Sequence, residues 1–180
     1  MNPSDLVAQI PGLRRYARAL TGDSWAADDL VQDTLERACQ KWRLWAIGSD
    51  LRAWLFTLMH HLHAGGVRQT MRRSASLRQV DIDDVAAELV APETAQDLAL
   101  DLQRCLLRLP EEQRAVLLLV SLEDMSYEQV ARITDTPIGT VMSRLSRART
   151  RLQALMDAPA VDQAPQHLDV QPPAHLKRLK

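Results

Sequence analysis

Arginines recur at helical spacing near the end of the chain, and they could bind nucleic acid. Arg144, Arg147 and Arg151 would share one helix face with Thr140 and Ser143. An arginine can clamp a phosphate or pair with guanine through two hydrogen bonds. Thr140 and Ser143 fall in the first turns of the helix, where backbone N–H groups also favour phosphate. This face therefore predicts contact with double-stranded DNA.

The segments around this face have the pattern of a helix-turn-helix motif. We expect one helix from about Tyr127 to Thr134, capped by Ser126, and a second from about Ile138 to Met156. Asp135 stands where a left-handed turn residue is needed. An apolar stripe lies beside the arginine face: Val141, Leu145, Ala148, Leu152 and Leu155. The second helix would thus pack on one face and meet DNA with the next. The alternative is an ordinary helical hairpin with solvated arginines.

An earlier helix, expected from about Trp25 to Trp42, has two distinct faces. The polar face holds Asp28, Asp29, Gln32, Asp33, Glu36 and Gln40. The apolar face holds Leu30, Val31, Leu35, Ala38 and Trp42. Such a carboxylate-rich face suits docking of a basic partner. The alternative is a solvated surface, which is a common role for acidic helix faces.

A third helix, from about Leu51 to Arg73, combines an aromatic ring with basic groups. The residues in this sector are Trp54, Thr57, His61, Gly65, Arg68 and Arg72. Unpaired bases stack on aromatic rings, so the sector suits single-stranded nucleic acid. A core tryptophan flanked by arginines with buried stems is the alternative. His60 and His63 have helical i, i+3 spacing, but no cysteine or carboxylate at suitable spacing completes a metal site, and we expect none.

The composition favours an all-α protein. Apolar residues make up 46% of the 180 residues, aromatic residues only 4%, and there are only 6 glycines. Strong helix formers dominate, and no run alternates between apolar and polar residues. We expect two small helical bundles joined by a flexible linker: residues 1–75 and 93–156, with the linker at 76–92 and a disordered tail at 157–180. Within the first bundle, Pro11 and Gly12 are expected to bend a helix from about Ser4 to Leu20.

The charge pattern suggests that the chain needs a partner to bind DNA well. The net charge is −1, whereas a free-standing DNA binder usually has a basic excess. The charges are also segregated, because Gly66 to Val80 holds four arginines and no acid while Asp81 to Gln103 holds seven acids and no base.

Two cysteines, Cys39 and Cys105, are expected to be buried free thiols in a reducing, cytoplasmic protein. No apolar run is long enough for a membrane helix.

Two blocks of sequence together resemble the group IV (extracytoplasmic-function, ECF) sigma factors of bacterial RNA polymerase. The first contains LRRYARALTGDSWAADDLVQDTLERACQKW and LRAWLFTLMHHLHAGGVRQTMRR. The second contains LPEEQRAVLLL and MSYEQVARITDTPIGTVMSRLSRAR. The resemblance covers about residues 10–75 and 105–153 in the family's order and spacing. The family implies a sigma-2-like domain and a sigma-4-like domain with a helix-turn-helix at 127–146.

The resemblance also implies partners and roles. Core RNA polymerase would bind through its β′ clamp helices and its β flap, with the clamp helices contacting Asp29, Gln32, Asp33 and Glu36. The third helix would open and read the −10 element, and the arginine face would read the −35 element. An anti-sigma factor is a further implied partner, whereas no cofactor or membrane insertion is implied. The chain has HHLHAGGVR where the family commonly has RNLAIDLLR, so His60, His61 and Gly65 replace Arg, Asn and Asp. His61 can still donate a hydrogen bond and stack on a base.

Two other classes of function are alternatives to a sigma factor. A stand-alone helix-turn-helix regulator would bind duplex DNA without polymerase, but it gives no reason for the two-faced second helix. An enzyme would need reactive groups in a recognisable pattern. The sequence has no phosphate-binding glycine loop, no cysteine pair at metal spacing and no nucleophile elbow. We therefore expect a protein with no catalytic residues.

Overall fold

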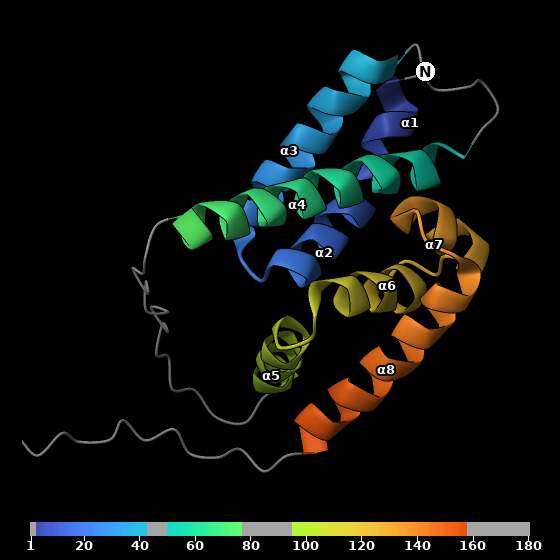
Figure 1. Cartoon of the computed structure of the whole chain (residues 1–180). Coiled ribbons are helices and arrows are strands. Elements are labelled where there is room, and N and C mark those ends of the chain that lie inside the picture. Colours follow the sequence, from blue (N-terminus) through green and yellow to red (C-terminus); the bar gives the residue numbers. More distant parts are fainter. Residues whose placement is uncertain (1–2, 43–49, 77–94, 158–180) are drawn as a thin grey trace, which may run out of the picture.

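All regular elements in the described part of the chain are α-helices (Figure 1). The computed structural model describes residues 3–42, 50–76 and 95–157, with the side chains of 68–76 and 95–97 left undescribed. The N-terminal half holds α1 (Pro3–Val7), α2 (Ile10–Thr21), α3 (Ser24–Lys41) and α4 (Leu51–Ser76). The C-terminal half holds α5 (Ala95–Leu107), α6 (Glu111–Ser121), α7 (Tyr127–Thr134) and α8 (Ile138–Asp157). The expected linker and tail fall almost entirely outside the described residues.

Local signals set the boundaries of the helices in the N-terminal half. Gly22 ends α2 with φ of 77°, in the left-handed region that glycine adopts most easily. Asp23 then caps α3 by accepting a hydrogen bond of 2.7 Å from the backbone N–H of Ala26. The expected bend at Pro11 is wrong. The helix stops after Val7, and Pro11 lies in the first turn of α2, where its missing N–H has no intrahelical partner to lose.

The helix-turn-helix of the C-terminal half forms as the sequence predicts. Ser126 and Gln129 cap the start of α7 reciprocally, each side chain bonding the other's backbone N–H. Asp135 ends α7 at φ 49° and ψ 48°, which is the expected left-handed turn. Helix α8 then packs across α5, α6 and α7. The capped turn therefore fixes the angle at which α8 leaves α7.

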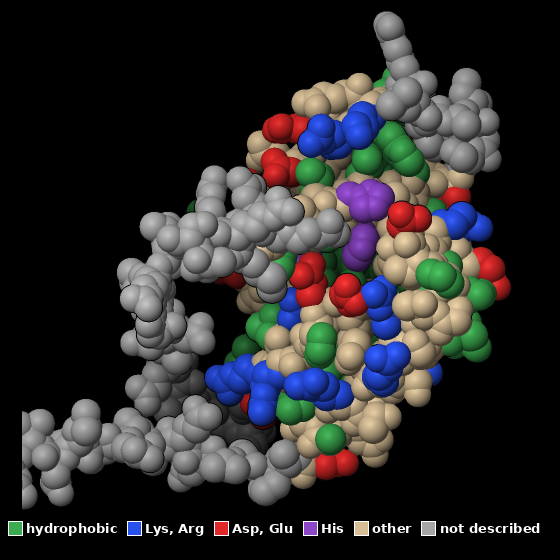
Figure 2. All heavy atoms as spheres, viewed as in Figure 1, with side chains coloured by type: hydrophobic (Ala, Val, Ile, Leu, Met, Phe, Trp, Pro, Cys, Tyr) green, Lys and Arg blue, Asp and Glu red, His purple; other side chains and the backbone are tan. Residues whose placement is uncertain are grey.

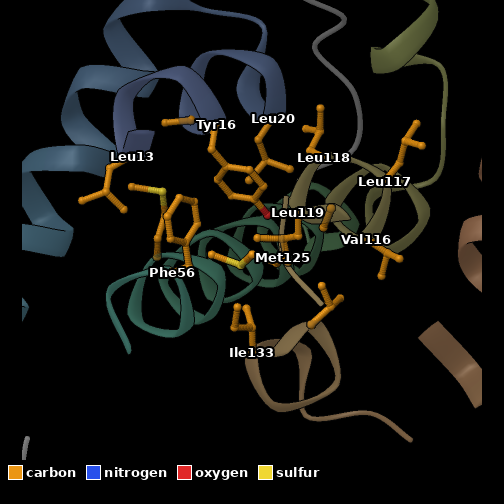
Figure 3. Close-up of a cluster of buried hydrophobic side chains, with 14 of the residues drawn as sticks. Leu13, Tyr16, Leu20, Phe56, Val116, Leu117, Leu118, Leu119, Met125 and Ile133 are labelled. Atoms are coloured by element: carbon orange, nitrogen blue, oxygen red, sulfur yellow. The ribbon is translucent and has the colours of Figure 1, made fainter. Parts of the chain in front are cut away.

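The two halves pack against each other around one hydrophobic core. Tyr16 and Phe56 come from the N-terminal half and meet edge to face, with ring centroids 5.3 Å apart. Leu119 and Ile133 of the C-terminal half are buried in the same cluster (Figure 3). Helix α4 lies against α7, and α2 lies against α5 and α6. The two bundles therefore contact each other in this structure, and we call this packing the closed arrangement.

Gly22 shows how closely the halves approach. A Cβ atom added at this glycine would lie 2.5 Å from Cδ1 of Leu107, at the end of α5.

The expectation of two buried thiols is wrong, because Cys39 is exposed and Cys105 is only partly buried. Cys39 lies on the outer side of α3, next to the polar face rather than within the apolar one. None of the described helices is both long and apolar enough to cross a membrane.

Candidate nucleic-acid interface and acidic docking face

Helix α8 presents its apolar stripe to the core, as predicted. Val141, Leu145 and Ala148 are buried, and Leu152 and Leu155 pack partly against the same cluster. On the neighbouring face Arg147 and Arg151 are exposed. Thr140 and Ser143 are partly buried, and the Ser143 hydroxyl donates a 3.0 Å hydrogen bond to the Thr140 carbonyl oxygen. The C-terminal part of the arginine face is therefore accessible to a phosphate backbone.

Arg144 differs from the sequence expectation of a freely accessible arginine. Its side chain is only 20% exposed, and its guanidinium forms an ion pair with the carboxylate of Glu112 at the start of α6. Helix α8 packs against α6, which brings Arg144 next to the first turn of α6. Both residues belong to the C-terminal half, so Arg144 is paired within that half.

A polar pocket lies between Arg144 and α4, which is the third helix predicted from the sequence. The pocket has a volume of about 690 Å³ and is lined by His60 and His61 of α4, Glu111 and Glu112 of α6, and Arg144 of α8, among others. Figure 2 shows histidine side chains beside acidic and basic ones near the middle of this face. Two residues predicted to contact DNA, His61 and Arg144, therefore line the same pocket from opposite halves.

The α4 sector predicted to contact unpaired bases is only partly accessible. His61 is exposed, whereas Trp54 is half-buried and packs against the core beside Leu51 and Leu58. Thr57 is also half-buried, and its hydroxyl donates a 2.8 Å hydrogen bond to the Ala53 carbonyl oxygen. Trp54 thus takes part of the core role that the sequence left as an alternative. The side chains of Arg68 and Arg72 lie outside the described residues, and exposed Gly65 has no side chain to contribute.

His63 lies between the two halves and contacts an acid. Its Nδ1 atom is 3.0 Å from the Oε1 atom of Glu111. Burial lowers the pKa of His63 below its usual value, and the Glu111 carboxylate opposes that shift only in part. Within the described residues no group of three histidine, cysteine or acidic side chains is placed to hold a metal ion.

The acidic face of α3 is solvent-accessible. Asp29, Gln32, Asp33 and Glu36 are all exposed, while Leu30, Val31 and Ala38 are buried on the opposite side. The Gln32 amide donates a 3.0 Å hydrogen bond to the Glu36 carboxylate, which orients two of these groups. Asp28 pairs with Arg14 of α2 at 3.0 Å and is less available to a partner.

Sequence reasoning missed an aromatic residue on this face. Trp25 is 86% exposed, the largest exposure among the large apolar side chains in the described residues. It precedes Asp29 by one helical turn and continues the line through Gln32 and Glu36. The helical spacing of residues 25, 29, 32 and 36 was the available signal. Exposed tryptophan beside carboxylates is the composition of a protein-binding surface rather than of a solvated helix.

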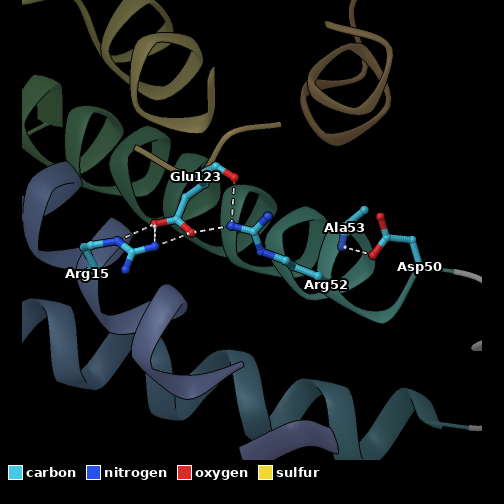
Figure 4. Close-up of polar contacts among 5 residues, drawn as sticks. All are labelled: Arg15, Asp50, Arg52, Ala53 and Glu123. Atoms are coloured by element: carbon cyan, nitrogen blue, oxygen red, sulfur yellow. Dashed lines mark hydrogen bonds and ion pairs between the residues drawn. The ribbon is translucent and has the colours of Figure 1, made fainter. Parts of the chain in front are cut away.

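Sequence reasoning also missed Glu123, in the loop between α6 and α7. Its side chain is fully buried, and its carboxylate lies 2.9 Å from Arg15 of α2 and 2.7 Å from Arg52 of α4 (Figure 4). Arg52 also donates a 2.8 Å hydrogen bond to the backbone carbonyl oxygen of Glu123. No local sequence signal distinguishes this glutamate from a solvated one, because both arginines are distant in the chain.

Comparisons with known proteins agree with this geometry. Residues 6–60 match a family described as "Sigma2 domain of PhyR", and residues 99–152 match "Sigma-70, region 4". The chain is 37% identical to the ECF RNA polymerase sigma factor EcfG of Rhodopseudomonas palustris, with 84% of this chain and 83% of the relative covered. It is 34% identical to the ECF sigma factor SigM of Mycobacterium tuberculosis, covering 80% and 71% respectively.

Solved structures show the same similarity. The sigma factor RpoE of Bartonella quintana, solved with the anti-sigma factor NepR, superposes with a TM-score of 0.74 at 35% identity, covering 86% of this chain and 96% of that one. CnrH, solved in complex with the cytosolic domain of CnrY, gives a TM-score of 0.61 at 26% identity, covering 87% and 88%.

Proposed function

This chain belongs to the ECF sigma factors of bacterial RNA polymerase, and we propose that its two halves divide the tasks of promoter recognition. Sigma factors are transcription initiation factors that catalyse no reaction of their own. In this proposal residues 1–75 bind polymerase and the −10 element, and residues 93–156 bind the −35 element. Residues 76–92 connect them, 157–180 form a tail, and the protein acts in the cytoplasm.

The acidic face of α3 is the proposed docking site for the β′ clamp helices of core polymerase. Four exposed polar residues support it: Asp29, Gln32, Asp33 and Glu36. Opposite charges across an interface speed association and set orientation, so this face requires a basic surface on the polymerase. The β flap is the proposed contact of the C-terminal half.

The arginine face of α8 is the proposed reader of the −35 element. Arg147 and Arg151 are accessible to phosphates, and Arg144 is placed one turn earlier for contact with base edges. In α4, exposed His61 is the proposed contact with a displaced base at the −10 element, assisted by Trp54, Thr57, Arg68 and Arg72. Flipping a base out of the duplex costs a few kcal/mol, which stacking and hydrogen bonds would offset.

An anti-sigma factor is a further proposed partner, because RpoE and CnrH were both solved with proteins bound. The surface that suits such a partner is an apolar groove of about 860 Å³ between α2, α5, α6 and α8. Leu102 and Leu106 contribute to its lining, and Arg14, Arg18 and Arg149 are among its basic residues. This combination fits an amphipathic helix with acidic flanks.

The observation that carries the proposal is the pairing of the two-faced α3 with a capped helix-turn-helix in one chain. A stand-alone regulator needs the second feature and has no use for the first. The test is transcription with purified core polymerase and a promoter library, in which the chain should yield transcripts from specific start sites. Specific binding to duplex DNA without any gain in transcription would favour the stand-alone regulator.

A charge reversal tests the docking face in the same assay. Asp33→Lys should weaken binding to core polymerase because it places a cation against a basic surface. Asp5→Lys in α1 is the matched control, since it makes the same charge change at an exposed aspartate outside both α3 and the C-terminal half. Equal polymerase affinity of the two variants would contradict the assignment of α3.

A further inference from the structure

We propose that the free chain is held closed by a buried latch at Glu123, and that closure hides Arg144 from DNA. The masking part of this inference rests on the proposed role of α8 in reading the −35 element. The latch itself rests only on the contacts between the two halves.

The latch joins two helices, α2 and α4, to the loop between α6 and α7 through one carboxylate. Arg15 of α2 approaches both oxygens of Glu123, with Nε at 3.0 Å from Oε1 and Nη2 at 3.0 Å from Oε2. Arg52 of α4 contacts Oε2 at 2.7 Å. The Glu123 side chain has no exposed surface, whereas those of Arg15 and Arg52 are 53% and 38% exposed. The buried charge thus depends on cations that both come from the other half.

Other polar contacts close the same interface. The Gln129 amide of α7 donates a 2.8 Å hydrogen bond to the Asp50 carboxylate at the start of α4. His63 of α4 meets Glu111 of α6. Gly12 of α2 lies directly under the latch, because a Cβ there would be 3.2 Å from Oε2 of Glu123. These contacts fix one relative placement of the halves rather than a loose association.

The closed arrangement is incompatible with reading both promoter elements. By their names the −10 and −35 elements are about 25 base pairs apart, which is roughly 85 Å of B-DNA. His61 and Arg144, the proposed contacts for the two elements, line a single pocket of about 690 Å³. A pocket of that volume has room for a small molecule, but not for two separate segments of DNA. The halves must therefore separate before both elements can be bound.

The interface also carries features that allow it to open. In the described residues the Tyr16 hydroxyl and Nε of Arg114 are buried without a hydrogen-bond partner. Both groups would gain hydrogen bonds to water on separation, which offsets part of the lost packing. A buried charge pair is similarly near balance, since hydration of the separated ions compensates for their lost attraction. Closure is thus a state that polymerase binding can reverse.

The first test removes the cations and measures the separation of the halves. Arg15→Ala/Arg52→Ala leaves Glu123 buried without a partner, so the chain should open. The matched control is Arg14→Ala/Arg104→Ala, because within the described residues these arginines form ion pairs with Asp28 and Asp101 of their own halves. Spin labels on native Cys39 and on Thr150→Cys, in a Cys105→Ser background, report the distance between α3 and α8.

The latch variant should show a longer label distance than the control with unchanged helicity by circular dichroism. Its affinity for a duplex taken from upstream of a start site used by the holoenzyme should rise at least about tenfold, because the competent fraction of the free chain increases. An unchanged distance would overturn the latch. A longer distance without tighter duplex binding would overturn the masking of Arg144, while start-site-specific transcription by the holoenzyme tests the proposed function separately.

A second test does not depend on the stability of the latch variant. Asp50→Cys/Gln129→Cys, in a background lacking Cys39 and Cys105, can be joined by a short thiol-cleavable bis-maleimide across the interface. The linked chain should lose duplex binding and transcription, and cleavage of the linker should restore both. Equal activity of the linked and cleaved forms would overturn the proposal.

Discussion

Gly12 and Gly65 both lie in regular helix, but we expect replacement by alanine to stabilise the protein only at Gly65. A glycine in a helix interior costs about 0.5–1 kcal/mol relative to alanine, through backbone entropy. Gly65 has open space around the position of an added Cβ atom, whereas at Gly12 the Cβ would lie 3.2 Å from Oε2 of Glu123. The surroundings of each residue therefore decide whether the entropic gain survives.

We expect Gly65→Ala to raise the free energy of unfolding by about 0.5–1 kcal/mol. Gly12→Ala should lose that gain, because the buried carboxylate held by Arg15 and Arg52 has no room to move away. Urea denaturation followed by circular dichroism measures both. Equal stabilisation by the two substitutions would contradict the tight contact between α2 and Glu123.

Arg144 forms an ion pair with Glu112 in this structure and is also the proposed contact with a base of the −35 element. We expect Arg144→Ala to weaken promoter recognition by the holoenzyme by about 1–3 kcal/mol, with relaxed preference at one base pair of the −35 element. Arg149→Ala is the control, since Arg149 lies outside the arginine face and lines the apolar groove. Competition between promoters that carry single base changes measures the preference. An unaltered −35 preference would remove Arg144 from base recognition.

The residues that sequence reasoning could and could not place differ in the range of their contacts. Asp135 was predicted as a left-handed turn residue because only its immediate neighbours matter, and its φ of 49° confirms this. Glu123 and the pairing of Arg144 were missed because their partners are far away in the chain. Arg15 and Arg52 lie 108 and 71 residues before Glu123. Local patterns carry no information about such contacts.

The same distinction holds for whole helices. Helix α7 is as short as the sequence predicts, because Ser126 caps it and Asp135 ends it. The prediction of a bend at Pro11 was wrong because the sequence alone does not distinguish a proline in the first turn of a helix from a proline at a kink. The apolar stripe of α8 was correctly predicted from its period. The helical period of α8 does not predict which other helix lies against its arginine face.

Helix α3 is the element whose surface is best suited to a protein partner. Trp25 continues the line of Asp29, Gln32 and Glu36, so we expect it to become buried when core polymerase binds. Aromatic residues at interface centres often contribute about 2 kcal/mol or more when truncated. Trp25→Ala should therefore weaken core polymerase binding by about 30-fold, measured by titration of labelled sigma factor.

The control for Trp25 is another exposed apolar residue of the same half. Val7 in α1 is 60% exposed and lies outside α3. Val7→Ala should leave polymerase affinity within about twofold of the original, as for most surface positions outside an interface. If Trp25→Ala binds polymerase as tightly as Val7→Ala does, the aromatic residue lies outside the docking surface.

At the scale of the whole molecule, the low net charge and the closed arrangement both limit the binding of the free chain to DNA. A net charge of −1 provides little general attraction to DNA, and in the closed arrangement α4 lines the pocket beside Arg144. The free chain therefore combines weak electrostatic attraction with a partly covered reading face. Separation of the halves, as proposed, would remove α4 from the pocket beside Arg144, and we expect promoter binding to be coupled to holoenzyme assembly through α3.

Closure should also depend on pH through His63. Its surroundings include Glu111 and Arg114 of the C-terminal half and Asp29 and Asp33 of α3. Burial lowers the pKa of His63 in the closed arrangement below the usual 6.5. Above about pH 6.5 the ring is neutral whether the chain is closed or open, and its contribution to closure is complete. As the pH falls through the lowered pKa, the open form takes up a proton more readily, and closure weakens.

We therefore expect the distance between labels on Cys39 and Thr150→Cys to lengthen on acidification from pH 7 to pH 5, with little change between pH 7 and 8. His63→Gln should flatten that dependence, because glutamine fills similar space and does not titrate. His61→Gln is the matched control, since His61 is exposed on the same helix and lies outside the His63–Glu111 contact. A pH profile that survives His63→Gln and disappears in His61→Gln would place the sensitive group in the pocket beside Arg144 instead.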